Sequence, residues 1–294
     1  ISNVKNISEQ LYVDADRRQE FIAAMDADSA VSGFESMVRR KDGSTIWVSE
    51  NVRAVRDAKG VLMYYEGTVS DITDRKSAQE ALKFQQEQSE KLLLNILPKP
   101  IAERLKLEET TIADSFEEVS VLFADIVGFT ELSARMSPTE LVKRLNVIFS
   151  HFDQLAEKYG VEKIKTIGDA YMVVGGLPTP REDHAEAIAQ MALGMQEKIA
   201  NLSAETGERL AIRIGINSGP VVAGVIGVSK FTYDLWGDTV NVAARMEVTA
   251  FANSIQVTAV TYELLKDKYV LDKRGIVPVK GKGDMVTYWL VKKK

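Results

Sequence analysis

The chain has 294 residues, of which 45% are apolar and 27% charged, a composition typical of a folded protein of one or two domains. Its net charge of −5 gives no sign of a broad nucleic-acid-binding surface, and it contains no apolar run of the ~18 residues that cross a membrane. The absence of cysteine excludes disulfides, thiolate metal sites and cysteine nucleophiles. Because the sequence shows no signal peptide either, we expect a cytoplasmic protein.

Residues 1–74 form the first predicted unit. A short helix over 15–25 precedes three strands, which are separated by glycine turns at Asp42-Gly43 and Lys59-Gly60. The strands are predicted at 33–39, 45–55 and 61–69. Alternating polar and apolar residues bounded by such turns are typical of an antiparallel meander.

Part of this unit resembles a known sensor family. Residues 34–44, Trp47-Val48 and residues 67–73 are similar to the C-terminal half of a PAS domain. The resemblance implies that the Asp-Ile-Thr at 71–73 leads into an outgoing helix. It also implies that the upstream half of the sensor lies outside this sequence, so the stimulus is not identified. The alternative is a plain meander that serves as a dimer surface.

Residues 75–97 predict a charged, glutamine-rich helix. Its seam follows the 4,3 spacing of a coiled coil, with a polar middle. The seam positions are Ala78, Leu82, Gln85, Ser89, Leu92 and Ile96. A weak seam can shift register and relay a signal, or the segment is a simple linker helix. Pro98 and Pro100 end it and a short helix over 101–107 follows, so 75–117 is predicted to be a signalling helix and connector.

Residues 118–294 form the second predicted domain. A buried strand over 119–126 leads to a helix that begins at the capping box of Ser137 and Glu140 and ends at Gly160. A hairpin over 163–174 follows. The later elements are a helix over 182–202, strands at 210–216 and 220–226 joined by a turn at 217–219, a helix from Asp238, and strands near 269–278 and 286–292. The order strand–helix–hairpin–helix–strand predicts an α+β, ferredoxin-like (βαββαβ) fold.

Two aspartates in this domain indicate a metal site. Asp125 ends the first apolar strand, and Gly128 allows a tight turn whose N–H groups can face an anion. Asp169 lies in the turn of the hairpin over 163–174. A hairpin beside the first strand brings the two carboxylates together, and paired carboxylates that share divalent ions are the skeleton of two-metal phosphoryl chemistry.

Four motifs, in order, make almost all of 118–294 resemble the class III nucleotide cyclase catalytic domain. They are residues 123–130, 165–169, 236–246 and 279–283. The resemblance implies that Asp125 and Asp169, with the Ile126 carbonyl, bind two Mg²⁺ or Mn²⁺ ions. One ion would activate the ribose 3′-hydroxyl and the other would stabilise the departing pyrophosphate. Gly128 and Phe129 are assigned to the substrate-binding segment by the same resemblance.

The resemblance also assigns residues to the ribose and the phosphates. Asn241 and Arg245 lie four apart and therefore share one helix face. It implies that Asn241 orients the ribose and that Arg245 stabilises charge on the α-phosphate in the transition state. It implies that Lys280, or Lys282 in its place, binds the triphosphate. The plainer reading is a solvent-exposed helix pair and a solvated loop lysine.

Lys165 and Asp234 match the purine-selecting pair of the family. Lys165 can donate to adenine N1 and Asp234 can accept from the adenine N6 amine, whereas guanine presents the reverse pattern at these atoms. Guanylate-forming members usually carry a glutamate and a small residue there. The alternative role for Lys165 is a salt bridge to a neighbour such as Asp169.

These assignments predict an adenylate cyclase that converts ATP to 3′,5′-cyclic AMP and pyrophosphate. In this family each active site takes its metal carboxylates from one chain and its base and transition-state residues from the other, so we expect a homodimer with two shared sites. The alternatives are a guanylate cyclase and a catalytically silent regulatory module. A diguanylate cyclase is disfavoured because Gly175-Gly176 is followed by Leu177-Pro178, and no P-loop is present.

Overall fold

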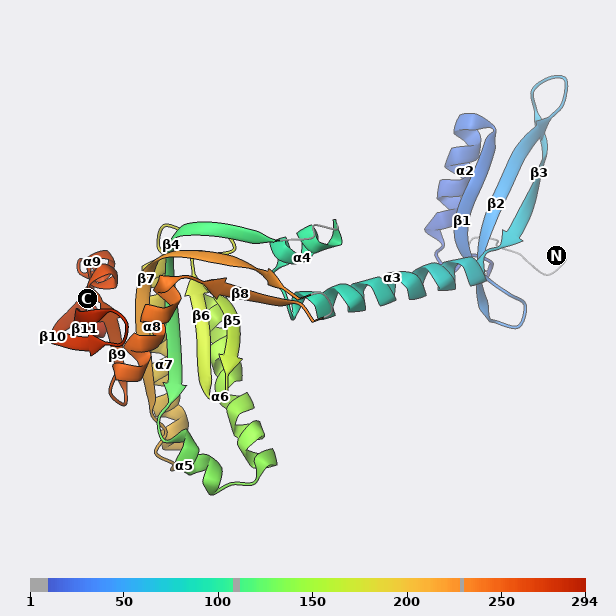
Figure 1. Cartoon of the computed structure of the whole chain (residues 1–294). Helices are drawn as coiled ribbons and strands as arrows, with labels where there is room; N and C mark the ends of the chain where they lie inside the picture. Colours follow the sequence, from blue (N-terminus) through green and yellow to red (C-terminus); the bar gives the residue numbers. More distant parts are fainter. Residues whose placement is uncertain (1–9, 108–111, 228–229) are drawn as a thin grey trace. The chain divides into compact units, whose positions relative to one another are not determined.

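The computed structural model describes residues 10–107, 112–227 and 230–294 (Figure 1). The chain divides into two compact units, Ile1–Leu92 and Leu93–Lys294. None of the helices in the described residues is long and apolar enough to cross a membrane.

The first unit is a three-stranded antiparallel sheet with one helix packed against it, as the sequence predicted. The sheet has the strand order β1-β2-β3, and the helix α2 buries Phe21 and Met25. All residues of β3 are exposed. The elements are α2 (Asp16–Asp28), β1 (Ala30–Arg39), β2 (Thr45–Arg56) and β3 (Leu62–Asp71).

Helix α3 (Thr73–Leu94) follows β3 and buries none of its residues. The sequence predicted that this helix would continue to residue 97, and that Ile96 would complete its seam. That boundary is wrong, because the chain turns at Leu94 and the side chain of Leu97 enters the core of the second unit, beside Ile101. Pro98 is the N-cap residue of α4 (Lys99–Lys106), and Pro100 lies in the first turn of that helix.

The second unit is built on a sheet with the path β10-β11-β9-β7-β4-β6-β5, and β8 pairs with β7 outside this path. Its strands are β4 (Ala113–Ile126), β5 (Glu162–Ile167), β6 (Ala170–Gly175), β7 (Ile212–Ile226), β8 (Thr232–Trp236), β9 (Ser254–Thr258), β10 (Tyr269–Val279) and β11 (Gly283–Lys293). Its further helices are α5 (Phe129–Ala134), α6 (Pro138–Tyr159), α7 (His184–Thr206), α8 (Asp238–Thr249) and α9 (Ala259–Leu265).

The predicted βαββαβ order is present as β4–α6–β5–β6–α7–β7. These four strands lie in the order β7-β4-β6-β5, and all three pairings are antiparallel. The α6 boundaries follow from local chemistry: Ser137 and Glu140 form the predicted capping box, and Gly160 ends the helix with a φ of 61°.

Strand alternation gives the central sheet two different faces. On one face, Leu122 and Ile214 pack under α6 and α7, which lie side by side in Figure 1. On the other face, Val121 and Phe123 pack with α4, β8 and Ala243 of α8. We call this second face the α8 face. Asp125 continues the alternation of Val121 and Phe123 and therefore belongs to it.

The sequence predicted two strands joined by a turn at 217–219, and this is wrong. Residues 212–226 form the single strand β7, which stays paired with β4 through Asn217 and Ser218. Both polar side chains are buried and hydrogen-bonded: Asn217 Nδ2 donates to the Thr239 carbonyl over 3.1 Å, and Ser218 Oγ lies 2.6 Å from Ser120 Oγ. Buried hydrogen-bond partners thus satisfy these two side chains, which water would satisfy in an exposed turn. Elements α5, β8, β9 and α9 were not predicted.

Candidate active site

The two aspartates of the predicted metal site lie next to each other. Asp125 is the penultimate residue of β4, and Asp169 lies in the turn between β5 and β6, where Gly168 has a φ of 62°. Because β4 pairs with β6 beside this turn, the two carboxylates interact. Burial and then the neighbouring Asp125 raise the pKa of Asp169 above its ordinary value. Two carboxylates that repel each other form a site that a divalent cation would stabilise.

Arg213 on β7 faces this pair from the adjacent strand. Its Nη2 donates to Asp125 Oδ2 over 2.7 Å, and its Nε donates to Glu247 Oε1 over 2.5 Å. Burial lowers the pKa of the Arg213 guanidinium, but the carboxylates of Glu247 and Asp125 outweigh this and raise it. Burial also raises the pKa of Glu247, against the opposing effect of Arg213. The positively charged side chain of Arg213 therefore already occupies a place beside Asp125.

The donor set fits a hard divalent ion. Asp125 and Asp169 offer carboxylate oxygens, and Ile126, whose carbonyl the sequence predicts as a further ligand, is buried next to Asp125 at the end of β4. Within the described ranges no group of three or more His, Cys, Asp and Glu residues could hold a metal ion by itself. Further ligands would therefore come from water or from the oxygens of a phosphate.

Lys165 and Asp234, which are 69 residues apart in sequence, form an ion pair between β5 and β8. The Asp234 Oδ1 atom also accepts a hydrogen bond of 2.8 Å from the Leu235 N–H. Both side chains are partly accessible, with exposed fractions of 35% for Lys165 and 16% for Asp234. The structure therefore places a hydrogen-bond donor directly beside an acceptor. Among the ion pairs of the described residues, Lys165 pairs with Asp234 and not with Asp169, which was the alternative.

Glu162, at the start of β5, has a carboxyl whose pKa burial raises from 4.5 to about 7. The folded state holds this proton more tightly than the unfolded chain, so stability falls as the pH rises from 4.5 to about 7 and then levels off. We expect Glu162→Gln to raise the free energy of unfolding by about 2 kcal/mol at pH 8 and to leave it nearly unchanged at pH 4. Urea titrations at both pH values measure this, and an equal gain at both would contradict a charge effect.

Helix α8 carries Asn241 and Arg245 on an exposed face, and Val242, Ala243 and Met246 are buried, as the sequence predicted. The helix lies directly on β7. A Cβ atom built on Gly215 would come within 1.9 Å of the Glu247 backbone nitrogen, so only glycine allows this approach.

Lys280 and Lys282 lie in the turn between β10 and β11 and are both exposed. Lys282 Nζ pairs with Asp238 Oδ1 in the first turn of α8 over 2.6 Å. This contact ties the turn to the helix that carries Asn241 and Arg245. Gly128 has a φ of 75° and precedes α5, and the half-buried Phe129 packs against the core under α6 and α7.

The candidate residues of one chain are only partly connected by contacts. Among the residues that the structure describes, no hydrogen bond or ion pair joins the side chains of Asp125 or Asp169 to the other candidates. Those candidates are Lys165, Asp234, Asn241, Arg245 and Lys280.

Sequence reasoning missed Arg213 and Glu247. Two signals could have found them. Arg213 is flanked by isoleucines in a buried strand, and Glu247 lies four residues after Ala243 on the apolar side of α8. A charge in each of these buried settings requires a partner.

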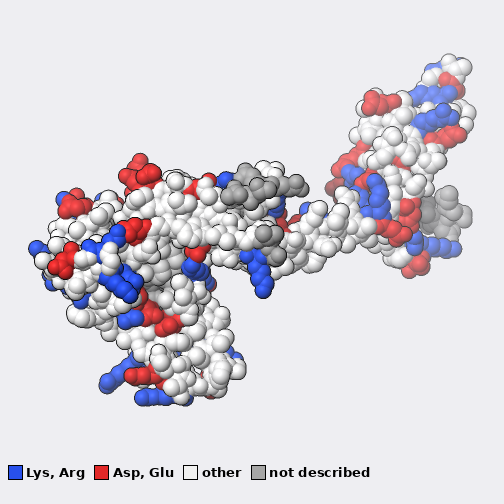
Figure 2. Space-filling view, in the orientation of Figure 1, with Lys and Arg blue, Asp and Glu red and all other residues white. Residues whose placement is uncertain are grey.

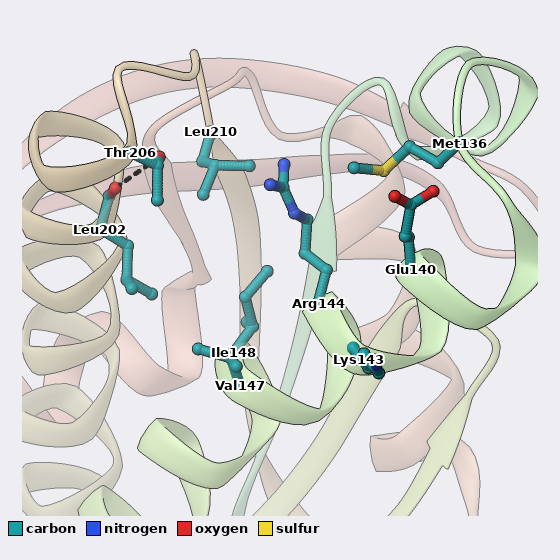
Figure 3. A pocket seen from close by; sticks show the side chains of 9 residues that line it. All are labelled: Met136, Glu140, Lys143, Arg144, Val147, Ile148, Leu202, Thr206 and Leu210. Carbon is teal, nitrogen blue, oxygen red and sulfur yellow. Dashed lines mark hydrogen bonds between the residues drawn. The ribbon is translucent and has the colours of Figure 1, made fainter.

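A cavity of about 350 Å³ lies elsewhere on this unit, between α6, the end of α7 and the segment leading to β7 (Figure 3). Met136, Val147 and Leu202 contribute its apolar lining, and none of the candidate residues lines it. Arg144 forms an ion pair with Glu208 beside it. On the face drawn in Figure 2, acidic and basic side chains are interspersed over this unit, in keeping with the net charge of −5.

An α+β domain with adjacent carboxylates at the end of its central strand, and an arginine-bearing helix across β7, has the parts of a nucleotide cyclase. The profile of the family described as "Adenylate and Guanylate cyclase catalytic domain" matches residues 111–292. The chain belongs to this family of enzymes.

The relatives include cyclases of both kinds. The protein named "Adenylate cyclase" from Mycobacterium tuberculosis (strain ATCC 25618 / H37Rv) is 49% identical over 224 residues, which are 76% of this chain and 51% of that protein. The chain thus spans about half the length of the curated adenylate cyclases that it matches.

Two solved structures are also similar. The guanylate cyclase domain of RhGC from Catenaria anguillulae, in complex with GTP, is 43% identical with a TM-score of 0.60, covering 62% of this chain and 100% of that one. The adenylyl cyclase CyaB from P. aeruginosa is 30% identical with a TM-score of 0.60, covering 62% of this chain and 97% of that one.

Proposed function

We propose that the chain is an adenylate cyclase that converts ATP to 3′,5′-cyclic AMP and pyrophosphate. The observation that carries the choice of ATP is the contact between Lys165 and Asp234. Their Nζ and Oδ atoms offer a donor and an acceptor side by side, as adenine N1 and N6 require, and guanine would place like against like. A relative named adenylate cyclase supports this choice, and the GTP complex of a guanylate cyclase relative makes base selection the point to test.

Class III cyclases use divalent metal ions, and we propose that Asp125, Asp169 and the Ile126 carbonyl hold two of them, Mg²⁺ or Mn²⁺. Bound there, the ions would supply positive charge to the 3′-hydroxyl and to the phosphates. The reaction forms the bond from O3′ to the α-phosphorus, breaks the bond to the bridging oxygen, and releases pyrophosphate and the hydroxyl proton.

The remaining candidates would act on the nucleotide itself. Asn241 would orient the ribose, and the permanently charged guanidinium of Arg245 would stabilise charge that develops on the α-phosphate. Lys280 would bind the triphosphate from the turn between β10 and β11. Its exposure and its position beside α8 suit a group that closes on a bound ligand.

We further propose that the enzyme works as a homodimer with two shared active sites. The absence of hydrogen bonds and ion pairs between the carboxylate pair and the other candidates, among the described residues of one chain, supports this, because the α8 helix and base-selecting pair of a second copy could complete the site. The first unit, with its resemblance to part of a PAS domain, would be a sensor, and α3 would transmit its state. Because α3 buries none of its residues, it has a face free to pair with a second copy.

A product assay tests the proposed reaction. ATP and GTP are supplied in parallel, each with Mg²⁺ and with Mn²⁺, to the wild type and to Asp169→Ala. We expect cyclic AMP from ATP alone and at least a 10²-fold loss in Asp169→Ala, because a metal ligand is removed. The control is Asp272→Ala, which removes an exposed aspartate on β10. Cyclic GMP as the main product would favour the guanylate cyclase, and no cyclic product would favour a silent module.

A further inference from the structure

Three charged side chains on three elements meet at the edge of the carboxylate pair. Asp125 lies on β4, Arg213 on β7 and Glu247 on α8, and the guanidinium bridges the other two. The exposed side-chain fractions are 14%, 34% and 8% respectively, so water screens these charges only in part.

The backbone fixes this arrangement. Arg213 stands opposite Asp125 in the ladder between β4 and β7. Gly215 lets α8 approach β7 so closely that the Glu247 backbone nitrogen lies directly over the strand. Arg213 is thus held between Asp125 and Glu247. If its contact with Asp125 is lost, it still lies near Glu247.

We propose that Arg213 is a resident counter-cation that competes with divalent ions for Asp125, and that Glu247 is a positioning residue that weakens this competition. The proposal rests on the proposed function in one respect, namely that Asp125 and Asp169 bind the metal ions. Together, Arg213 and Glu247 would set the affinity of the enzyme for metal ions before the nucleotide binds.

The signs of the two effects follow from charge. A metal ion on Asp125 takes over a carboxylate that the guanidinium now uses, and it is repelled by that guanidinium. Glu247 offsets the repulsion because it neutralises part of the guanidinium charge and remains its partner when Asp125 is taken. Removing the Arg213 charge should therefore tighten metal binding, and removing the Glu247 charge should weaken it.

A purely structural role predicts a different result. If Arg213 and Glu247 serve only to hold α8 on the sheet, either substitution loosens the end of β4. Metal binding would then weaken in both variants. The opposite signs expected for Arg213→Gln and Glu247→Gln distinguish the two possibilities.

Binding of Mn²⁺ to the full chain without nucleotide, measured from the electron paramagnetic resonance signal of free Mn²⁺, tests the proposal. We expect Arg213→Gln to lower the dissociation constant about fivefold and Glu247→Gln to raise it about fivefold. Glu247→Asp keeps the charge and should bind nearly as the wild type does. Arg144→Gln, which breaks an ion pair away from the carboxylates, is the matched control and should leave Mn²⁺ binding unchanged.

Each outcome decides the matter. Equal or weaker Mn²⁺ binding by Arg213→Gln overturns the proposal, as does unchanged binding by Glu247→Gln. If Arg213→Gln does not fold, the comparison of Glu247→Gln with Glu247→Asp decides, and equal loss in both overturns it. Asp169→Asn in the same assay separates the two levels: if it binds Mn²⁺ like the wild type, the metal site of the proposed function fails and this inference fails with it. If Asp169→Asn binds Mn²⁺ more weakly than the wild type while Arg213→Gln binds it no more tightly, only this inference is wrong.

Discussion

Asp125→Ala and Arg245→Ala should each be inactive alone and should regain about a quarter of the wild-type activity when mixed in equal amounts. The reason is that the two residues would serve different active sites of one dimer. Random exchange of subunits makes half of the dimers mixed, and each mixed dimer has one intact site of its two. Cyclic AMP formation, followed against the mixing ratio after subunit exchange, measures the recovery.

The matched control for this experiment mixes Asp125→Ala with Asp169→Ala. Both lesions then lie in the carboxylate half, so every site of every dimer is damaged and no activity should return. Recovery in this control would mean that the carboxylates do not act together. A failure of the first mixture to recover, with dimers still present by light scattering, would rule out shared sites.

The second large effect is expected from exchanging the base-selecting pair. The double variant Lys165→Glu with Asp234→Ser places an acceptor near guanine N1–H and a hydroxyl donor near guanine O6. We expect the ratio of kcat/KM for ATP over that for GTP to fall by about 10³-fold. Two hydrogen bonds to adenine are lost, and the new side chains then place an acceptor against the acceptor N1 and a donor against the donor N6 of adenine.

The control for the specificity change is Lys163→Glu. Lys163 lies on the same strand, is exposed, and pairs with Asp153 instead of Asp234. It repeats the lysine-to-glutamate change of Lys165→Glu at a neighbouring position of the strand and should leave the ratio for ATP over GTP unchanged. If the ratio in the double variant also stays at the wild-type value, Lys165 and Asp234 do not select the base.

Much of the second unit could be predicted because its signals are local. The capping box at Ser137, the stop at Gly160 and the turn at Gly168 each fix an element boundary through nearby backbone chemistry. Pairing of the flanking strands then brought Asp169 to Asp125. The assignment of Lys165 and Asp234 as a base-selecting pair came from a family resemblance alone, and no local signal in the sequence predicts the ion pair that they form between β5 and β8.

The errors arose where distant residues decide the local structure. Asn217 and Ser218 look like turn residues, but buried hydroxyl and carbonyl groups from other elements hold them within a strand. The joint role of Arg213 and Glu247 depends on β7 and α8 touching at Gly215, which no sequence window contains. The roles of the site residues in catalysis stay predictions until the variants above are measured.

The unbroken course of β7 decides where a reporter domain can be inserted into this protein. By composition alone, residues 217–219 would seem a suitable entry point. An insertion there would split β7, the strand that carries Arg213. It would interrupt the pairing of β7 with β4 and fall next to the residues of β7 that pair with β9. The exposed residues Lys266, Asp267 and Lys268, between α9 and β10, offer a safer junction, because foreign sequence there would interrupt neither a strand nor the candidate site.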